Sequence, residues 1–208
     1  MAAQSDFAKL SYQTHKSGYG DYAHDGPKAD HARAWLDEGC INTWRFNRMY
    51  ALADPLLASH QGARWLTVGD GRYGMDAMYL KAHGARALAT DISDTLLAEA
   101  KAQGLIDDFR KENAEALSFP DASFDFVFCK ESCHHIARPM RALREMLRRP
   151  THYHDFEVAG NCVYSISRRE MHKVALGLGL RTVAFQGVND YYVLGIESYA
   201  SPAWVRRG

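Results

Sequence analysis

The sequence lacks several features that would place it in other classes of protein. It has no apolar run long enough to span a bilayer and no signal-peptide pattern at its start, so we expect a cytoplasmic protein with no membrane partner. Its 25 basic residues balance its 25 acidic residues, so no excess of positive charge indicates a nucleic-acid partner. Its four cysteines form no C-x-x-C pair, which favours the scattered thiols of an intracellular enzyme.

What the sequence does contain is a glycine cluster between a short apolar run and a helical pattern, over residues 65–75. This order of strand, glycine turn and helix opens the ligand-binding half of many open α/β sheets. The glycines let the backbone turn sharply and approach a ligand that a Cβ would exclude; they are Gly69, Gly71 and Gly74. Asp91 ends the apolar run 85–90, the position of an acidic residue that binds ribose hydroxyls. A glycine pattern alone is also compatible with an ordinary turn.

The remaining pattern alternates strands with helices. It predicts strands near 85–90, 108–112 and 124–129, and helices near 75–83, 93–104, 138–149 and 167–178. Two final strands, 181–186 and 191–196, flank an Asn189-Asp190 turn, which is typical of an antiparallel hairpin. At 208 residues the chain suits one α/β domain with a small appendage. We predict a Rossmann-like, mostly parallel sheet with helices on both faces and a C-terminal antiparallel hairpin.

The N-terminal part of the chain has a different composition. Residues 1–27 are polar and rich in tyrosine, histidine and glycine, which predicts loop structure. Two interpretations stay open, a disordered leader and a lid over the ligand. Two helical patterns follow, the second with an apolar stripe at Phe46, Met49, Tyr50 and Ala53. We assign residues 1–60 to an N-terminal helical lid segment and residues 61–208 to the main domain.

One segment decides between families that share the glycine turn. Residues 113–129 read N-A-E-A-L-S-F-P-D-A-S-F-D-F-V-F-C, which resembles the D-A-x-x-L-P-F-x-D-x-S-F-D-x-V signature of class I S-adenosylmethionine-dependent methyltransferases of the small-molecule type. The sequence Cys133-His134-His135 is similar to the x-H-H that follows the fourth strand in this family. The resemblance extends over residues 62–149. It implies methyl transfer from S-adenosylmethionine to a small-molecule acceptor by direct displacement; a homodimer is compatible with it.

The resemblance also implies a cofactor site. Its members would be Gly69, Asp70, Gly71, Gly74, Asp91, Ile92, Asn113, Ala114 and Lys130. Asp91 would accept hydrogen bonds from the ribose, Ile92 would lie on the adenine, and Asn113 would read the adenine amino group. The sequence departs from the family in two places, because Thr67 and Asn113 stand where carboxylates are usual. An inactive cofactor-binding module therefore remains an alternative, as does an NAD-dependent oxidoreductase.

Catalytic candidates follow the fourth predicted strand. His134 and His135 lie where open α/β sheets place their ligands, and histidine titrates near neutrality. We predict His135 as the general base, with His134 as the second candidate; the alternative is that they cap a turn or pack under the lid. His152 and His154 have no further ligand nearby, so we expect a solvated loop and no metal there.

The last expectation concerns a fifth strand. Residues 150–161 contain no run of β-branched residues, so we expect irregular structure there. The next candidate, Cys162–Ile166, is short and alternating, and we expect it to pair with the fourth strand instead. The alternative is a sheet with an uncovered edge beside Phe124–Cys129. A full-length central strand drawn from residues 150–161 would contradict this expectation.

Overall fold

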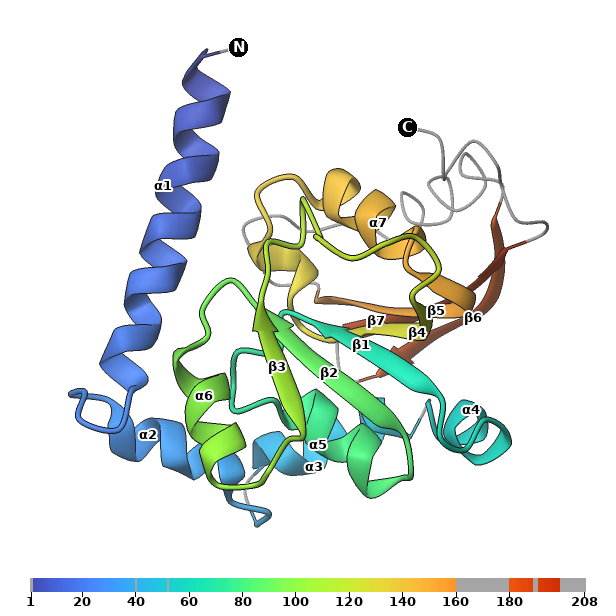
Figure 1. Ribbon diagram of the computed structural model, residues 1–208, viewed down its shortest axis with the longest axis horizontal. Helices are drawn as coiled ribbons and strands as arrows, with labels where there is room; N and C mark the ends of the chain where they lie inside the picture. The colour runs from blue at the N-terminus through green and yellow to red at the C-terminus, as the bar shows by residue number, and fades with distance from the viewer. Residues whose placement is uncertain (1, 40, 52, 160–179, 189–190, 199–208) are drawn as a thin grey trace.

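The computed structural model describes residues 2–39, 41–51, 53–159, 180–188 and 191–198. It contains a sheet in which the strand order is β3-β2-β1-β4-β5-β7-β6 (Figure 1). The strands are β1 (Arg64–Val68), β2 (Arg86–Asp91), β3 (Asp108–Lys111), β4 (Phe124–Cys129), β5 (Pro150–Ala159), β6 (Leu180–Val188) and β7 (Tyr191–Ser198). Strands β1 to β5 pair in parallel, and β7 pairs antiparallel with both β5 and β6. The predicted mostly parallel α/β sheet is confirmed. The turn between β6 and β7 lies outside the described residues.

Alternating side chains of the central strands face two separate cores. Trp65 of β1 stacks on Phe126 of β4 with 4.4 Å between ring centroids, and both rings lie on one face of the sheet. Leu66 and Val127, the next residues along each strand, lie on the other face and belong to the second core. Both faces are covered, which explains why β1 and β4 read as nearly continuous apolar runs.

Helices cover both faces of the sheet (Figure 1). On one side lie α3 (Ile41–Tyr50), α4 (Asp54–Ser59), α5 (Met75–Ala82) and α6 (Thr95–Ala102), with the short segments α2 (Ala29–Arg33) and η2 (Ala34–Leu36). On the other side lies α7 (Pro139–Leu147). The predicted stripe on α3 is confirmed, because Phe46, Met49, Tyr50 and Ala53 are all buried. None of the helices in the described part of the chain is long and apolar enough to cross a membrane.

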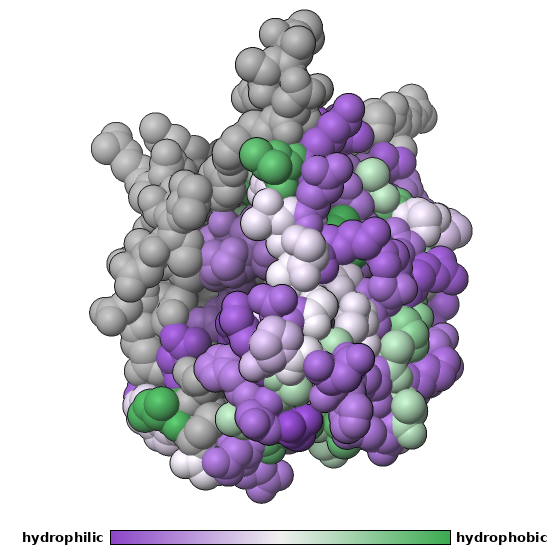
Figure 2. All heavy atoms as spheres, turned by 90° about the vertical axis from the view of Figure 1, so that its left-hand side faces the viewer, coloured by the Kyte–Doolittle hydropathy of each residue, from purple (hydrophilic) through white to green (hydrophobic). Residues whose placement is uncertain are grey.

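The prediction of loop structure for the N-terminal residues is wrong. A helix, α1 (Ala2–Gly18), occupies most of this stretch and is followed by the short helix η1 (Tyr19–Tyr22). The first glycine is Gly18, and no proline precedes it, so alanine, lysine, leucine and glutamine can favour the helix. Helix α1 stands beside the sheet and projects beyond it (Figure 1). Figure 2 shows this side of the molecule, where hydrophilic side chains predominate and apolar ones lie singly or in small groups.

The expectation of a missing fifth strand is also wrong. Residues Pro150–Ala159 form β5, which pairs in parallel with β4 and antiparallel with β7. Strand propensity depends strongly on context, and a strand hydrogen-bonded on both sides needs no run of β-branched residues. Pro150 stands at the first position of the strand, where its missing N–H is tolerated, beside a register shift in the pairing with β4. His152 and His154, expected in a solvated loop, lie in this strand. Cys162–Ile166 and the helix predicted from Ser167 lie outside the described residues.

Candidate functional site

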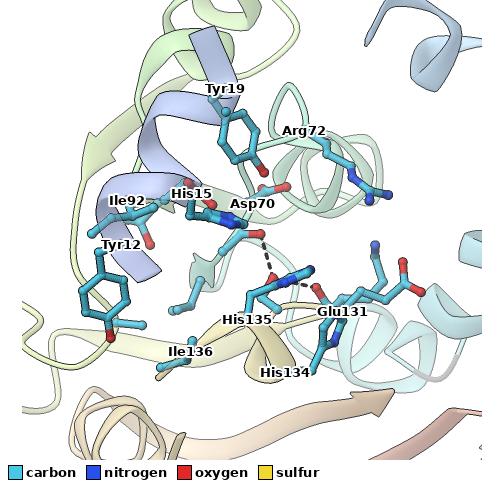
Figure 3. A pocket seen from close by; sticks show the side chains of 18 of the residues that line it. Tyr12, His15, Tyr19, Asp70, Arg72, Ile92, Glu131, His134, His135 and Ile136 are labelled. Carbon is cyan, nitrogen blue, oxygen red and sulfur yellow. Dashed lines mark hydrogen bonds between the residues drawn. The ribbon is translucent and has the colours of Figure 1, made fainter. Parts of the chain in front are cut away.

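A cavity of about 640 Å³ lies at the carboxyl ends of β1, β2 and β4, and α1 covers it (Figure 3). In the sheet, β1 lies between β2 and β4. The chain adds β2 and β3 on one side of β1 and then crosses to add β4 on the other side, so the strand order reverses at β1. Ligands of open α/β sheets bind at such a switch point. The predicted residues that line the cavity are Gly69, Asp70, Asp91, Ile92, Ala114, Lys130, His134 and His135.

The glycines of the turn have different roles. A Cβ on Gly71 would lie 2.6 Å from the Tyr19 hydroxyl and 2.8 Å from the Asp91 Cγ, so only glycine fits beneath these groups. Gly69 and Gly74 both have positive φ, at 79° and 68°. A Cβ on Gly74 would lie 2.8 Å from Ile106, so this glycine allows α5 to start close to the core. Gly71 and Gly74 are not among the residues that line the cavity.

Asp91 ends β2 with a buried carboxylate at the cavity wall. Its Oδ2 accepts the Gly71 N–H at 3.1 Å, and its Oδ1 accepts the Ser93 N–H at 2.8 Å. Burial raises the pKa of Asp91 to about 6, while the backbone N–H groups lower it less. The carboxylate is therefore held in one orientation and is ionised at neutral pH.

Asp70 is turned toward the start of α5. Its side chain accepts the N–H groups of Asp76 and Ala77 at 3.0 Å each and the Thr67 hydroxyl at 2.8 Å. Burial, with the neighbouring Asp76 carboxylate second, raises the pKa of Asp70 well above its ordinary value. The Thr67 hydroxyl thus donates a hydrogen bond to the carboxylate of Asp70, three residues later in the chain. The sequence alone did not show this direction of the Asp70 side chain.

A buried cation lies at the end of β4. The Lys130 Nζ is 3.1 Å from Asp76 Oδ1 and 3.9 Å from the centre of the Phe46 ring. The Tyr50 hydroxyl donates to the same Asp76 oxygen at 2.7 Å. Burial of a cation is tolerated because a carboxylate and aromatic faces surround it. We predicted Lys130 but missed Asp76, whose place in the first turn of α5 did not indicate a buried ion pair.

Three histidines from two segments face the same space (Figure 3). The His134 and His135 rings are 4.0 Å apart, and His15 of α1 lies 5.2 Å from His135. Burial lowers the pKa of all three, and lowers the pKa of His135 to about 4 with help from His134, His15 and Arg72. His134 is only 8% exposed, and its Nδ1 has no hydrogen-bond partner among the described residues. The His134 Nδ1 is therefore a buried polar atom without a hydrogen-bond partner in the described part of the chain, which is uncommon in folded proteins.

Asn113 does not reach the cavity, although its neighbour Ala114 does. The Asn113 Oδ1 accepts the Glu115 N–H at 2.9 Å and so closes a local turn. The predicted contact between Asn113 and an adenine amino group therefore has no support in this arrangement.

Helix α1 is held against the domain by a contact that the sequence did not indicate. The Tyr12 hydroxyl donates to Glu115, which is 1% exposed and also accepts the Arg138 backbone N–H at 2.8 Å. Arg138 adds an ion pair to the same carboxylate. Burial and Glu115 together raise the pKa of Tyr12, so its hydroxyl stays protonated and can donate. The tyrosines and histidines of residues 1–27 were the one available signal, because aromatic side chains favour packed positions.

Comparisons with known proteins agree with this geometry. Residues 66–149 match a family model described as a methyltransferase domain. No curated protein matches the sequence. Among solved structures, magnesium protoporphyrin IX methyltransferase from Synechocystis PCC 6803, with bound SAM, is similar over 88% of this chain and 96% of its own, with 16% identity and a TM-score of 0.70.

Two further solved structures have the same fold. The 1,6-didemethyltoxoflavin-N1-methyltransferase from Burkholderia thailandensis, with its acceptor and S-adenosylhomocysteine bound, is similar over 93% of this chain and 91% of its own, with 18% identity and a TM-score of 0.68. The [4+2]-cyclase SpnF is similar over 70% of this chain and 79% of its own, with 17% identity and a TM-score of 0.57. At such identities these structures show the fold, and a cyclase among them illustrates that one fold can support different reactions.

Proposed function

We propose that the protein transfers a methyl group from S-adenosylmethionine to a small-molecule acceptor by direct displacement; residues 66–149 match a family model described as a methyltransferase domain. The observation that carries the proposal is the position of Asp91. Its oriented carboxylate lies at the wall of a large cavity, at the switch point of the sheet. The volume of the cavity, which α1 covers in part, is that of a small-molecule site and favours a small acceptor over a macromolecule. The acceptors in the names of two fold neighbours, a porphyrin and a toxoflavin precursor, are small molecules as well.

The residues at the cavity fit an elongated nucleoside cofactor. The Asp91 carboxylate would accept the ribose hydroxyls, and Ile92 beside it would pack on the adenine. The Ala114 backbone amide would meet a ring nitrogen of the adenine. Gly69 and Asp70 would border the methionine part, because both line the cavity at the turn between β1 and α5. Lys130 would border the acceptor side.

S-adenosylmethionine, when bound, supplies a methyl group on a positively charged sulfur. A bond forms between the acceptor nucleophile and the methyl carbon as the carbon–sulfur bond breaks, and the electron pair of that bond goes to sulfur. The protein's part is to hold the reacting atoms in line and to exclude water. Alignment of this kind can lower the barrier by about 7–11 kcal/mol.

His135 is the proposed general base for an acceptor that must lose a proton. Its ring faces the cavity, and its low pKa keeps it neutral at physiological pH. A base of such low pKa is a weak one, and it serves best for an acceptor whose proton is already acidic. His134 also lines the cavity, with its ring 4.0 Å from that of His135, and is the second candidate for this role.

Residues 1–60 would act as a lid segment over residues 61–208. Support comes from α1 and η1, which supply Tyr12, His15 and Tyr19 to the cavity lining. The bond from Tyr12 to Glu115 ties this segment to the core domain. A lid of this kind excludes water from the reacting atoms.

Calorimetry with the purified protein tests the proposal. We expect S-adenosylmethionine and S-adenosylhomocysteine to bind at one site per chain and NAD not to bind. An acceptor screen that measures S-adenosylhomocysteine release then tests turnover. Binding without turnover on any acceptor would favour an inactive module, and binding of NAD alone would favour an oxidoreductase.

The role of His135 has its own test. With an acceptor in hand, His135→Ala should lower kcat by about 10²–10⁴-fold, the range of general base catalysis, and should leave cofactor affinity unchanged. His134→Ala is the matched comparison, because it removes the adjacent imidazole. If both variants keep full turnover, the acceptor needs no base from this pair.

A further inference from the structure

Arg72 lies at one end of the cavity, with Ile92 at the other. Figure 3 shows the two side chains on opposite sides, with Asp70 between them. Arg72 follows the turn glycine Gly71 directly and lines the cavity. The positive charge of Arg72 acts on three histidines of the cavity, because it contributes to the lowered pKa of His15, His134 and His135.

The guanidinium of Arg72 is held by an aromatic ring from the N-terminal segment. Its Cζ lies 5.0 Å from the centre of the Trp35 ring, within the range of a cation–π contact. Trp35 is itself only 9% exposed and packs against Tyr22 and His31, with ring centroids 4.9 Å and 5.5 Å away. The indole therefore has a defined place and orients the guanidinium that rests on it.

The other positively charged or N–H donor groups near the turn already have partners within the protein. Lys130, the other permanent cation that lines the cavity, forms an ion pair with Asp76. The first N–H groups of α5 are bonded to the Asp70 carboxylate. Arg72 differs, because in the described part of the chain no carboxylate lies within ion-pairing distance of it. An anionic group of a bound molecule at this end would thus meet Arg72 first.

We propose that Arg72, oriented by Trp35, binds the α-carboxylate of the methionine part of the cofactor. The inference rests on the proposed placement of the nucleoside at Asp91 and Ile92. With the adenine and ribose there, the methionine tail runs along the turn at Gly69 and ends beside Arg72. A guanidinium can take a carboxylate with two parallel N–H···O bonds, which fixes the direction of the tail and with it the position of the sulfur. Trp35 is a positioning residue in this arrangement.

Two ligands that differ in the amino-acid part test the proposal. S-adenosylhomocysteine has the carboxylate, whereas 5′-methylthioadenosine keeps the nucleoside and the sulfur but lacks it. Both are titrated by calorimetry into the wild-type protein and into Arg72→Gln. We expect the variant to bind S-adenosylhomocysteine about 10- to 100-fold more weakly, the range for lost charge-assisted hydrogen bonds, and to bind 5′-methylthioadenosine as the wild type does.

Arg48→Gln is the matched control. Arg48 lies 5.1 Å from the ring of Trp44 in a similar guanidinium–indole pair, but it does not line the cavity, so its loss should change neither affinity. Equal weakening of both ligands in Arg72→Gln, or of neither, would overturn the proposal while the placement of the nucleoside stands. Failure of the wild-type protein to bind either ligand would overturn the placement itself. Circular dichroism spectra of the variants establish that each is folded.

Discussion

Removal of the Asp91 carboxylate is the most direct test of the nucleoside site. This group accepts the Gly71 and Ser93 N–H groups and faces the cavity, so it is positioned to accept ribose hydroxyls as well. Asp91→Ala removes the acceptor and leaves space where it stood. We expect cofactor affinity to fall, because each hydrogen bond to a charged group contributes about 1.5–3 kcal/mol. One lost bond corresponds to about 10- to 150-fold weaker binding.

The same substitution should leave the protein folded. Two backbone N–H groups lose their acceptor, at a cost of about 1–3 kcal/mol each. The buried carboxylate is itself destabilising. Its pKa is raised from 3.8 to about 6, so above pH 7 the ionised form lowers the free energy of unfolding by about 3 kcal/mol. That cost disappears with the carboxyl group. The two contributions largely offset each other, and we expect the free energy of unfolding to change by less than about 3 kcal/mol.

The assay is titration of S-adenosylhomocysteine at several pH values. In the wild type the affinity should be constant above pH 7 and should fall as the pH drops through about 6, because the protonated carboxyl no longer accepts two hydroxyls. The Asp91→Ala variant should bind S-adenosylhomocysteine weakly at every pH. The control is Asp125→Ala, which removes a carboxylate that accepts the Arg64 N–H at 2.8 Å outside the cavity. Equal affinity of Asp91→Ala and wild type would refute the assignment of the ribose site.

Two further predictions concern the acid–base group and the N-terminal helix. The pKa of His135 is lowered to about 4, so its neutral form dominates above pH 4. Protonation of His135 should therefore not lower kcat between pH 7 and pH 5. A fall in wild-type kcat below about pH 6.5 that His135→Ala abolishes would contradict this prediction. Tyr12→Phe removes the hydroxyl that donates to Glu115, while Arg138 still pairs with that carboxylate. Amide hydrogen exchange in α1 should therefore become faster with little change in the melting temperature; unchanged exchange would mean that this bond does not hold the helix.

The central part of the fold could be predicted because its signals are local. The apolar run of β1, the glycine turn, the run that ends in Asp91 and the apolar run of β4 are each a pattern of only a few consecutive residues. The likeness to a methyltransferase domain was predictable for the same reason, since the signature at residues 113–129 lies inside the stretch that matches the family model. Strand β5 was missed because its strand state depends on pairing with β4 and β7, which no local propensity encodes.

Side-chain directions within the site were less predictable. The bond between Tyr12 and Glu115 joins residues 103 positions apart, and no periodic pattern marks it. Asp70 was named correctly as a residue near the site, but only the fold shows that its carboxylate faces α5 and the Thr67 hydroxyl. The amide of Asn113 could equally have faced a ligand or its own backbone; the structure shows the second.

The position of Tyr19 has a consequence for the kinetics of cofactor exchange. Its hydroxyl lies above Gly71 beside the Asp91 carboxyl, and burial and Asp91 raise its pKa, so it remains a neutral phenol. A ribose bound to Asp91 in the proposed manner would share part of this volume. Tyr19 must then move before a nucleoside can bind at Asp91, so we expect the rate of cofactor binding to depend on movement of η1.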